Sequence, residues 1–125
     1  MKINVILYSV LITAIFGTAG CKSEDGELKM EAKTIAGVMC KSIGVMNELK
    51  AASPADSALV NKLQAEYQII QTEMATLYQE FRTKYAEQTT SGEFNETFRK
   101  YLNESMLDCK NLSKEERESF EKGLK

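Results

Sequence analysis

Between residues 27 and 88 the apolar residues recur at helical spacing, and the only proline of the chain, Pro54, lies inside that stretch. Apolar residues three and four positions apart form one face of an α-helix. In the first part, residues 27–52, that face consists of Leu28, Ala32, Ile35, Met39, Ile43, Met46 and Leu49. In the second part, residues 54–88, a heptad seam consists of Val60, Leu63, Tyr67, Ile70, Met74, Leu77 and Phe81. The pattern predicts two long helices, the second capped by Ser53 with Pro54 at its first position.

The remaining breaks in the pattern predict two further helices. Thr90 and Glu93 form a capping pair at the start of a third helix, which is expected to end near residue 110. Ser113 and Glu116 form another such pair, and the short fourth helix that they begin is expected to end at Gly123. Runs of β-branched residues are rare after the N-terminal stretch, which favours helix throughout. We therefore expect an all-α fold, an up-and-down three-helix bundle with a short fourth C-terminal helix.

The first residues of the chain have the layout of an export signal. Lys2 supplies a positive charge, residues 3–16 are mostly apolar, and small residues at 17–20 precede Cys21. The apolar stretch is shorter than the roughly 20 residues that span a bilayer, which disfavours a permanent membrane helix. Two processing routes stay open on this evidence. An ordinary signal peptidase could cut after Gly20, or Cys21 could be modified before cleavage.

The stretch Thr18-Ala19-Gly20-Cys21 resembles the lipobox of bacterial lipoproteins, including the looser lipoboxes of spirochaete-type lipoproteins. The resemblance implies that residues 1–20 are a lipoprotein signal peptide and that Cys21 receives a diacylglycerol. It also implies a mature protein with three acyl chains, palmitate among them, and more than one chain holds a protein stably on a membrane. Residues 21–26 are then the lipidated cysteine and a polar tether, and residues 27–123 are the helical domain.

The same resemblance implies a location in the bacterial cell envelope. Lys22, rather than aspartate, follows the cysteine, so the inner-membrane retention signal of some lipoproteins is missing and an outer-membrane location is expected. Whether the protein faces the periplasm or the cell surface stays open. The overall plan, an exported helical chain with two additional cysteines, is similar to that of other small all-helical bacterial lipoproteins.

The chain contains three cysteines, Cys21, Cys40 and Cys109. Lipidation of Cys21 leaves an even pair in an oxidising compartment, where disulfides form. If the three long helices run up and down, a rise of about 1.5 Å per residue puts Cys40 about 20 Å and Cys109 about 25 Å from the first turn. Gly37 and Gly44 share a face with Cys40 and would permit another helix to approach it closely. A Cys40–Cys109 disulfide is therefore predicted, and two separate buried thiols are the alternative.

The composition argues against several classes of function. Histidine is absent, which removes the commonest general base and the commonest zinc ligand. Lys and Arg number 16 against 18 Asp and Glu, without the clustered positive charge that suits nucleic acid. The acidic residues fall on predicted outer faces, which lack the burial that acid–base catalysis uses. We expect no enzyme activity, no cofactor, no metal site and no nucleic-acid partner.

Two groups of residues are candidates for a partner surface. The acidic stripe consists of Glu66, Glu73, Glu80 and Glu87, which recur every seven residues. It is either a docking surface for a basic partner or a solvated flank of the second helix. The aromatic patch consists of Tyr78, Tyr85, Phe94 and Phe98, which with Phe81 surround the turn between the second and third helices. It is either an exposed binding patch, on an end that protrudes beyond the first helix and faces the membrane, or a closed core.

These observations lead to two hypotheses about function. The first is a lipid-anchored structural or protein-interaction module that binds other proteins through its helical surfaces and the membrane through its lipid. The second is a surface-exposed ligand-binding or adhesion lipoprotein that uses the aromatic patch. The protein partner and the oligomeric state do not follow from the sequence.

Overall fold

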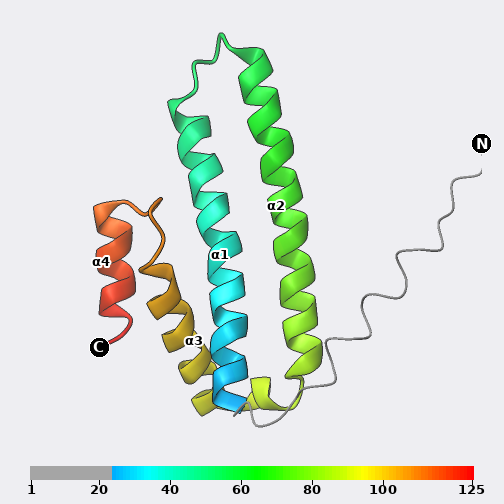
Figure 1. The fold of residues 1–125 in the computed structure, drawn as a ribbon, viewed down its shortest axis with the longest axis vertical. Coiled ribbons are helices and arrows are strands. Elements are labelled where there is room, and N and C mark those ends of the chain that lie inside the picture. The colour runs from blue at the N-terminus through cyan, green and yellow to red at the C-terminus, as the bar shows by residue number, and fades with distance from the viewer. Residues whose placement is uncertain (1–23) are drawn as a thin grey trace, which may run out of the picture.

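The structure is a computed structural model that describes residues 24–125, and within that range every regular element is helical. The elements are α1 (Glu24–Ala51), α2 (Ser57–Lys84), the short 3-10 helix η2 (Gln88–Thr90), α3 (Gly92–Met106) and α4 (Lys114–Lys122) (Figure 1). The prediction of an all-α fold with one disulfide is confirmed. None of these helices combines the length and the hydropathy that a membrane span requires.

Helix α1 is the centre of the arrangement. It forms a long antiparallel hairpin with α2 and packs along its lower half against α3, while α4 lies on the outer side of α3 (Figure 1). The upper part of the α1–α2 hairpin stands clear of α3 and α4 in the same view. Since α1 has helices on two sides, its buried residues do not lie on a single apolar stripe. Its buried residues are Leu28, Ala32, Ile35, Ala36, Val38 and Val45, of which the predicted stripe contains only the first three.

The buried side chains form three clusters, one for each region of contact. The base cluster joins α1, α2 and α3 and contains Leu28, Ile35, Phe81 and Tyr85. The hairpin cluster lies between α1 and α2 and contains Val38, Val45, Leu63 and Ile70. The disulfide cluster contains Ala36, Met106 and Cys109, with Leu112 and Phe120 packed against it. Phe120 thus attaches α4 to the rest of the protein. This role is expected, because Phe120 is the one large apolar residue of that helix.

Several predicted helix ends are wrong by a few residues. The N-cap of α2 is Asp56, whose Oδ1 accepts a hydrogen bond from the Leu59 N–H at 3.1 Å, and Pro54 lies outside the helix. Ser53 instead accepts a hydrogen bond from Ala55 within the turn. Aspartate and serine are about equally good N-caps, so the turn geometry decides between them. Helix α1 begins before residue 27, which makes residues 24–26 of the expected tether helical.

The third helix also differs from the prediction at both ends. Its N-cap is Ser91, because Thr90 lies in η2 and donates its hydroxyl hydrogen to the Glu87 carbonyl at 2.7 Å. Helix α3 ends at Met106, and Cys109 lies in the loop that follows rather than in the helix. The fourth helix agrees with the prediction. Its capping box of Ser113 and Glu116 is present, and Gly123 is its C-cap.

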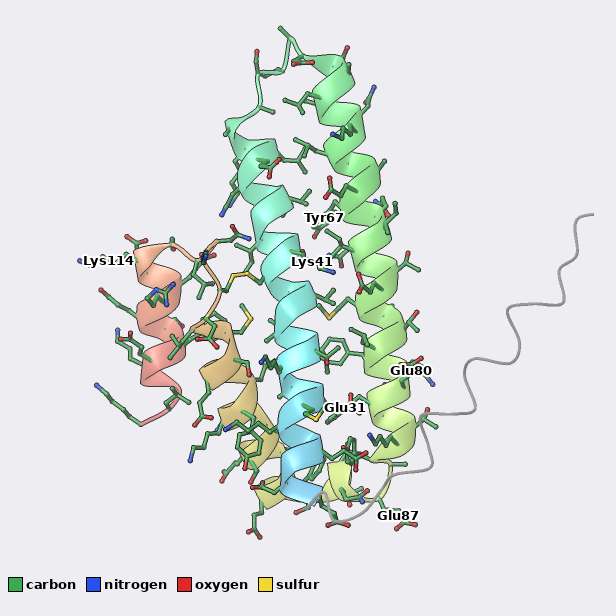
Figure 2. All side chains as sticks on the ribbon, in the orientation of Figure 1. Glu31, Lys41, Tyr67, Glu80, Glu87 and Lys114 are labelled. Atoms are coloured by element: carbon green, nitrogen blue, oxygen red, sulfur yellow. A yellow bond between two sulfur atoms is a disulfide. The ribbon has the colours of Figure 1, made fainter. Side chains whose placement is uncertain are left out.

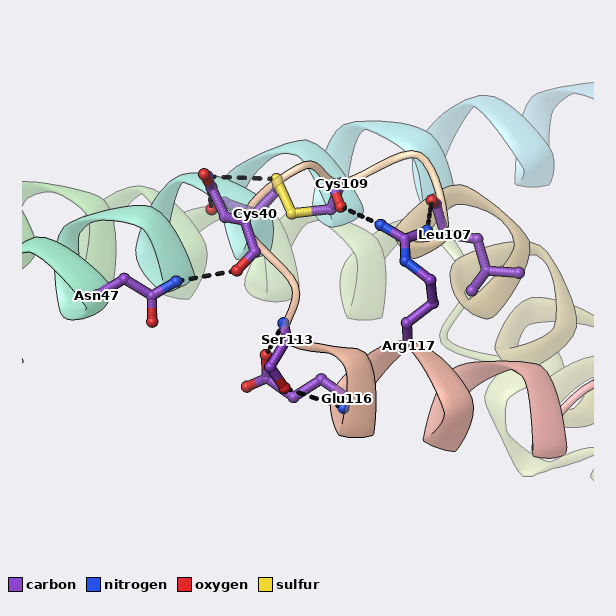
Figure 3. The surroundings of a disulfide bond; sticks show 8 residues. Cys40, Asn47, Leu107, Cys109, Ser113, Glu116 and Arg117 are labelled. Carbon is purple, nitrogen blue, oxygen red and sulfur yellow. Dashed lines mark hydrogen bonds between the residues drawn. A yellow bond between two sulfur atoms is a disulfide. The ribbon is translucent and has the colours of Figure 1, made fainter.

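The Cys40–Cys109 disulfide holds the loop after α3 against the middle of α1, with 5.6 Å between the two Cα atoms (Figure 3). Hydrogen bonds reinforce this junction. The Asn111 side chain donates to the Cys40 carbonyl at 3.0 Å, and the Asn47 side chain donates to the Asn111 carbonyl at 2.9 Å. From α4, Arg117 donates to the Leu107 and Cys109 carbonyls. The predicted close approach to the face of α1 that contains Gly37, Cys40 and Gly44 therefore occurs through a loop and not through a helix.

The two glycines of that face provide a matched pair of substitutions. A Cβ at Gly37 would meet no atom within 4 Å, so Gly37→Ala is expected to raise the free energy of unfolding by about 0.5–1 kcal/mol through helix propensity. A Cβ at Gly44 would lie 2.6 Å from the Asn111 side-chain nitrogen. Gly44→Ala must therefore displace that amide from the Cys40 carbonyl, and the lost hydrogen bond, worth about 1 kcal/mol, cancels the gain.

Urea unfolding of both variants measures this difference. We expect Gly37→Ala to be more stable than Gly44→Ala by about 1 kcal/mol or more. Equal stabilities would show that Asn111 does not hold the loop against α1 at this point.

Candidate functional site

The start of α1, the end of α2 and the start of α3 meet at one end of the molecule, here called the base. A cavity of about 540 Å³ opens there, the base cavity. It is lined by Glu24, Asp25, Glu27, Leu28, Lys84, Tyr85, Gln88, Ser91, Glu93, Phe94 and Thr97. The lining combines acidic side chains from two helix N-termini with two aromatic rings. Within residues 24–125 no group of three or more acidic or cysteine side chains is placed to hold a metal ion.

Three of the four predicted patch residues pack inward at the base. The Phe81 ring lies 4.8 Å from Tyr85, 6.2 Å from Phe94 and 4.3 Å from Phe98, measured between ring centroids. Tyr85 is buried, and Phe94 and Phe98 are half-buried. Such ring pairs stabilise beyond the area that they bury. The rings are covered because α1 and α2 are both 28 residues long, with α2 ending at Lys84, whereas the expected ranges 27–52 and 54–88 would have left this end of the second helix protruding.

Tyr78 lies apart from the other three aromatic residues. It is 38% exposed and lines a separate groove between α1 and α2 with Met39 and Met74. Only Tyr85 and Phe94 of the predicted patch line the base cavity. The four residues therefore do not form one continuous exposed surface.

The Tyr85 hydroxyl is a buried polar group that finds no hydrogen-bond partner within residues 24–125. Burial raises the pKa of this phenol, although the nearby Lys84 ammonium acts in the opposite direction. A buried hydroxyl without a partner has lost its hydrogen bonds to water and costs about 1–3 kcal/mol. The packing of the ring at the base compensates for this cost.

Replacing Tyr85 by phenylalanine tests this assignment. Tyr85→Phe removes the buried hydroxyl and keeps the ring, so the free energy of unfolding is expected to rise by about 1 kcal/mol. Tyr101→Phe is the matched control, because the Tyr101 hydroxyl donates a hydrogen bond to Asp25 and lies near the surface. Chemical unfolding should show no gain for the control. A loss of stability in Tyr85→Phe would mean that its hydroxyl has a partner.

Lys84 connects the end of α2 to the start of α1, and sequence reasoning missed it. Its ammonium lies 2.9 Å from a Glu27 oxygen and 2.7 Å from a Glu31 oxygen, and 5.4 Å from the Tyr85 ring centroid. Burial lowers the pKa of Lys84, but the hydrogen bonds with Glu31 and Glu27 outweigh it and the pKa lies above its usual range. While Glu27 and Glu31 are charged, the Lys84 charge therefore contributes stability that is fully present below the unfolded pKa of about 10.4 and is lost only in stronger alkali.

The acidic stripe is present only in part. Glu66, Glu73 and Glu80 are exposed on α2, whereas Glu87 lies beyond the end of that helix, at the base (Figure 2). The Lys41 ammonium lies 3.9 Å from Glu73, and both side chains are largely exposed, so this ion pair is weak. Glu66 and Glu80 form no ion pair within the part of the chain that the structure describes. The stripe is thus a row of solvated and mostly uncompensated charges.

The predicted lipidation site, Cys21, and the predicted signal peptide lie outside the described residues. Comparisons of the chain with models of known protein families, with curated proteins and with solved structures found no match.

Proposed function

We propose that this chain is a lipid-anchored helical protein of the bacterial cell envelope, an up-and-down bundle that acts as a structural or protein-interaction module. The observation that carries the proposal is the Cys40–Cys109 disulfide. It uses two of the three cysteines and leaves only Cys21, the cysteine that follows the apolar leader, without a protein thiol to pair with. Acylation accounts for that remaining thiol and for its place in a lipobox-like stretch. Catalysis forms no part of the proposal.

The place where α1 begins determines how the anchored protein would be oriented relative to the membrane. Helix α1 begins at Glu24, and three residues of chain reach at most about 10 Å from Cys21. The base would therefore lie next to the outer membrane. With a rise of about 1.5 Å per residue, α1 would carry the turn at residues 52–56 about 40 Å away from the lipid surface. The exposed sides of the α1–α2 hairpin would then be available to other envelope proteins.

Palmitate labelling of growing cells tests the anchor. The wild-type protein is expected to incorporate the label and to sediment with the outer membrane. Cys21→Ser is expected to lose both properties while it retains the Cys40–Cys109 disulfide. An intact mass of the wild-type protein without acyl chains would refute the proposal.

The base cavity supports a second candidate function, that of a ligand-binding or adhesion lipoprotein. Its volume of about 540 Å³ lies within the range of small-molecule sites, and Tyr85 and Phe94 line it. Native mass spectrometry of the wild-type protein is expected to show a bound small molecule under this alternative. Thr97→Trp fills the cavity and should abolish that additional mass without altering the modification of Cys21. If the wild-type and Thr97→Trp proteins differ in mass only by the substitution itself, the result would count against the ligand-binding function.

A further inference from the structure

A shallow groove runs along one flank of α2, between its solvent-facing side and its contact with α1. Its volume is about 600 Å³, and its lining residues are Ile69, Thr72, Glu73, Thr76, Leu77 and Glu80. All six belong to α2, so no other described helix closes it. Ile69 is 69% exposed, more than any other large hydrophobic residue within residues 24–125. An exposed isoleucine beside a groove marks a surface that a partner could cover.

Between residues 61 and 79, the side of α2 that points away from α1 carries a single charged residue, Lys62, one heptad before Ile69. At 3.6 residues per turn, that side is opposite to the buried Leu63 and Ile70. Its exposed uncharged residues are Asn61, Ala65, Gln68, Ile69, Thr72, Ala75, Thr76 and Gln79. Covering uncharged side chains with another protein avoids the large desolvation cost of buried charges. This face therefore suits helix packing better than a typical charged surface does.

The threonine hydroxyls on this face are already satisfied by their own helix. Thr72 donates to the Gln68 carbonyl at 3.0 Å, and Thr76 donates to the Thr72 carbonyl at 3.1 Å. Because the hydroxyls need no further partner, the γ-methyl groups are available for packing beside Ile69. Ala65 and Thr72 are seven residues apart, as are Ile69 and Thr76, so a second heptad seam lies on the outside of α2 after Lys62.

The groove has acidic residues along one flank only. Glu73 and Glu80 line it, and Glu66 continues the row one heptad earlier. In helix pairs that pack through heptad seams, flanking charges of opposite sign select the partner and its register. A helix with lysine or arginine along the facing flank would compensate these charges.

A second copy of the chain fits this surface less well. If two α2 helices paired antiparallel through the seam, each acidic flank would face the acidic flank of the other copy. If they paired parallel, each acidic flank would face the other flank of the seam, where Gln68 and Ala75 offer no positive charge. The charge pattern therefore favours a different chain as the occupant.

We propose that this groove is the docking site for an amphipathic helix of a partner protein, with small apolar residues on its packing face and basic residues along one flank. The inference deepens the proposed function, because it rests on the protein acting as an interaction module. Ile69 provides the apolar anchor, the threonine methyl groups provide close packing, and the glutamates provide orientation.

Binding of a synthetic helix tests the proposal. The probe is a fluorescent three-heptad peptide with alanine and isoleucine at its seam positions and lysine along one flank, added to the full-length protein in detergent micelles. We expect binding that weakens about tenfold when Glu66→Gln, Glu73→Gln and Glu80→Gln are combined. Ile69→Lys, at an exposed position that does not affect folding, is expected to remove binding. A twin peptide with glutamate in place of lysine should bind at least tenfold more weakly.

A second triple variant controls for net charge. Glu115→Gln, Glu118→Gln and Glu121→Gln neutralise three exposed residues of α4, away from the groove, and should leave the affinity unchanged within about twofold. Equal weakening by both triple variants would overturn the proposal, as would the absence of binding to the wild-type protein. Self-association that Ile69→Lys abolishes would identify a second copy as the occupant and would also overturn it.

The intact mass of each sample separates this proposal from the function on which it rests. A protein that binds the peptide but carries no acyl chains would refute the lipid anchor and keep the docking site. A lipidated protein that fails to bind the peptide would refute the docking site and keep the anchor.

Discussion

Removal of the disulfide by Cys40→Ser with Cys109→Ser is expected to lower the free energy of unfolding by about 2–4 kcal/mol. The two cysteines are 69 positions apart, so the bond closes a long loop in the unfolded chain. Loss of that constraint is worth about 4 kcal/mol in the chain-entropy model, and measured effects are commonly smaller. Cys109 is also a buried member of the disulfide cluster, so the serine adds a polar group to an apolar site.

Urea unfolding in a Cys21→Ser background measures this effect without a third thiol that could form new bonds. The Cys21→Ser protein that keeps Cys40 and Cys109 should show the same loss of stability when a reductant is added, because reduction breaks the same bond. We also expect α4 and the loop at residues 107–113 to lose protection from amide exchange before α2 does. A change below about 1 kcal/mol would contradict the view that the disulfide is a main support of the fold.

Phe81→Ala is expected to lower the free energy of unfolding by about 3–5 kcal/mol, the usual cost of removing a buried aromatic side chain. Phe81 is only 7% exposed and contacts the aromatic rings of Tyr85, the C-cap residue of α2, and of Phe98 in α3. It also packs in one cluster with Leu28 and Ile35 of α1. One substitution therefore removes the contact that joins all three long helices at the base.

Thermal or urea unfolding of Phe81→Ala should be compared with two controls. Phe81→Leu keeps most of the apolar volume and should cost less than half as much as alanine. Tyr78→Ala removes an aromatic residue that is 38% exposed and should cost about 1 kcal/mol or less. Similar losses for Phe81→Ala and Tyr78→Ala would mean that the base is not a closed core.

The number of helices and the disulfide could be predicted from the sequence, because both depend on patterns that repeat along the chain. Helical periodicity identified the long segments, and equal heights along neighbouring helices identified the cysteine pair. The burial of Val38 and Val45 could not be predicted in the same way. Both residues face α2, while Ala36 faces the disulfide cluster, so the apolar surface of α1 is divided between two partners. A single-stripe pattern assumes one partner.

The candidate site was predictable only in outline. Sequence reasoning placed the aromatic residues together at one end of the molecule, which follows from their positions on either side of a turn. Whether they are exposed depends on where α1 begins and where α2 ends. Glu24 and Asp25 are as compatible with a tether as with a helix N-terminus, and no glycine or proline marks the end of α2 at Lys84. The contacts of Lys84 with Glu27 and Glu31 depend on the register between α1 and α2, which the sequence alone does not specify.

The position of the disulfide has a consequence for proteolysis of this protein. The exposed turn at residues 52–56 separates α1 from the rest of the chain, and Cys40 and Cys109 lie on opposite sides of it. A protease that cuts this turn therefore produces two fragments that remain covalently joined. They are expected to separate in electrophoresis only after reduction, and whatever holds the N-terminal fragment in place holds the other as well. Nicking alone cannot release α2, α3 and α4, and their release requires a reductant in addition.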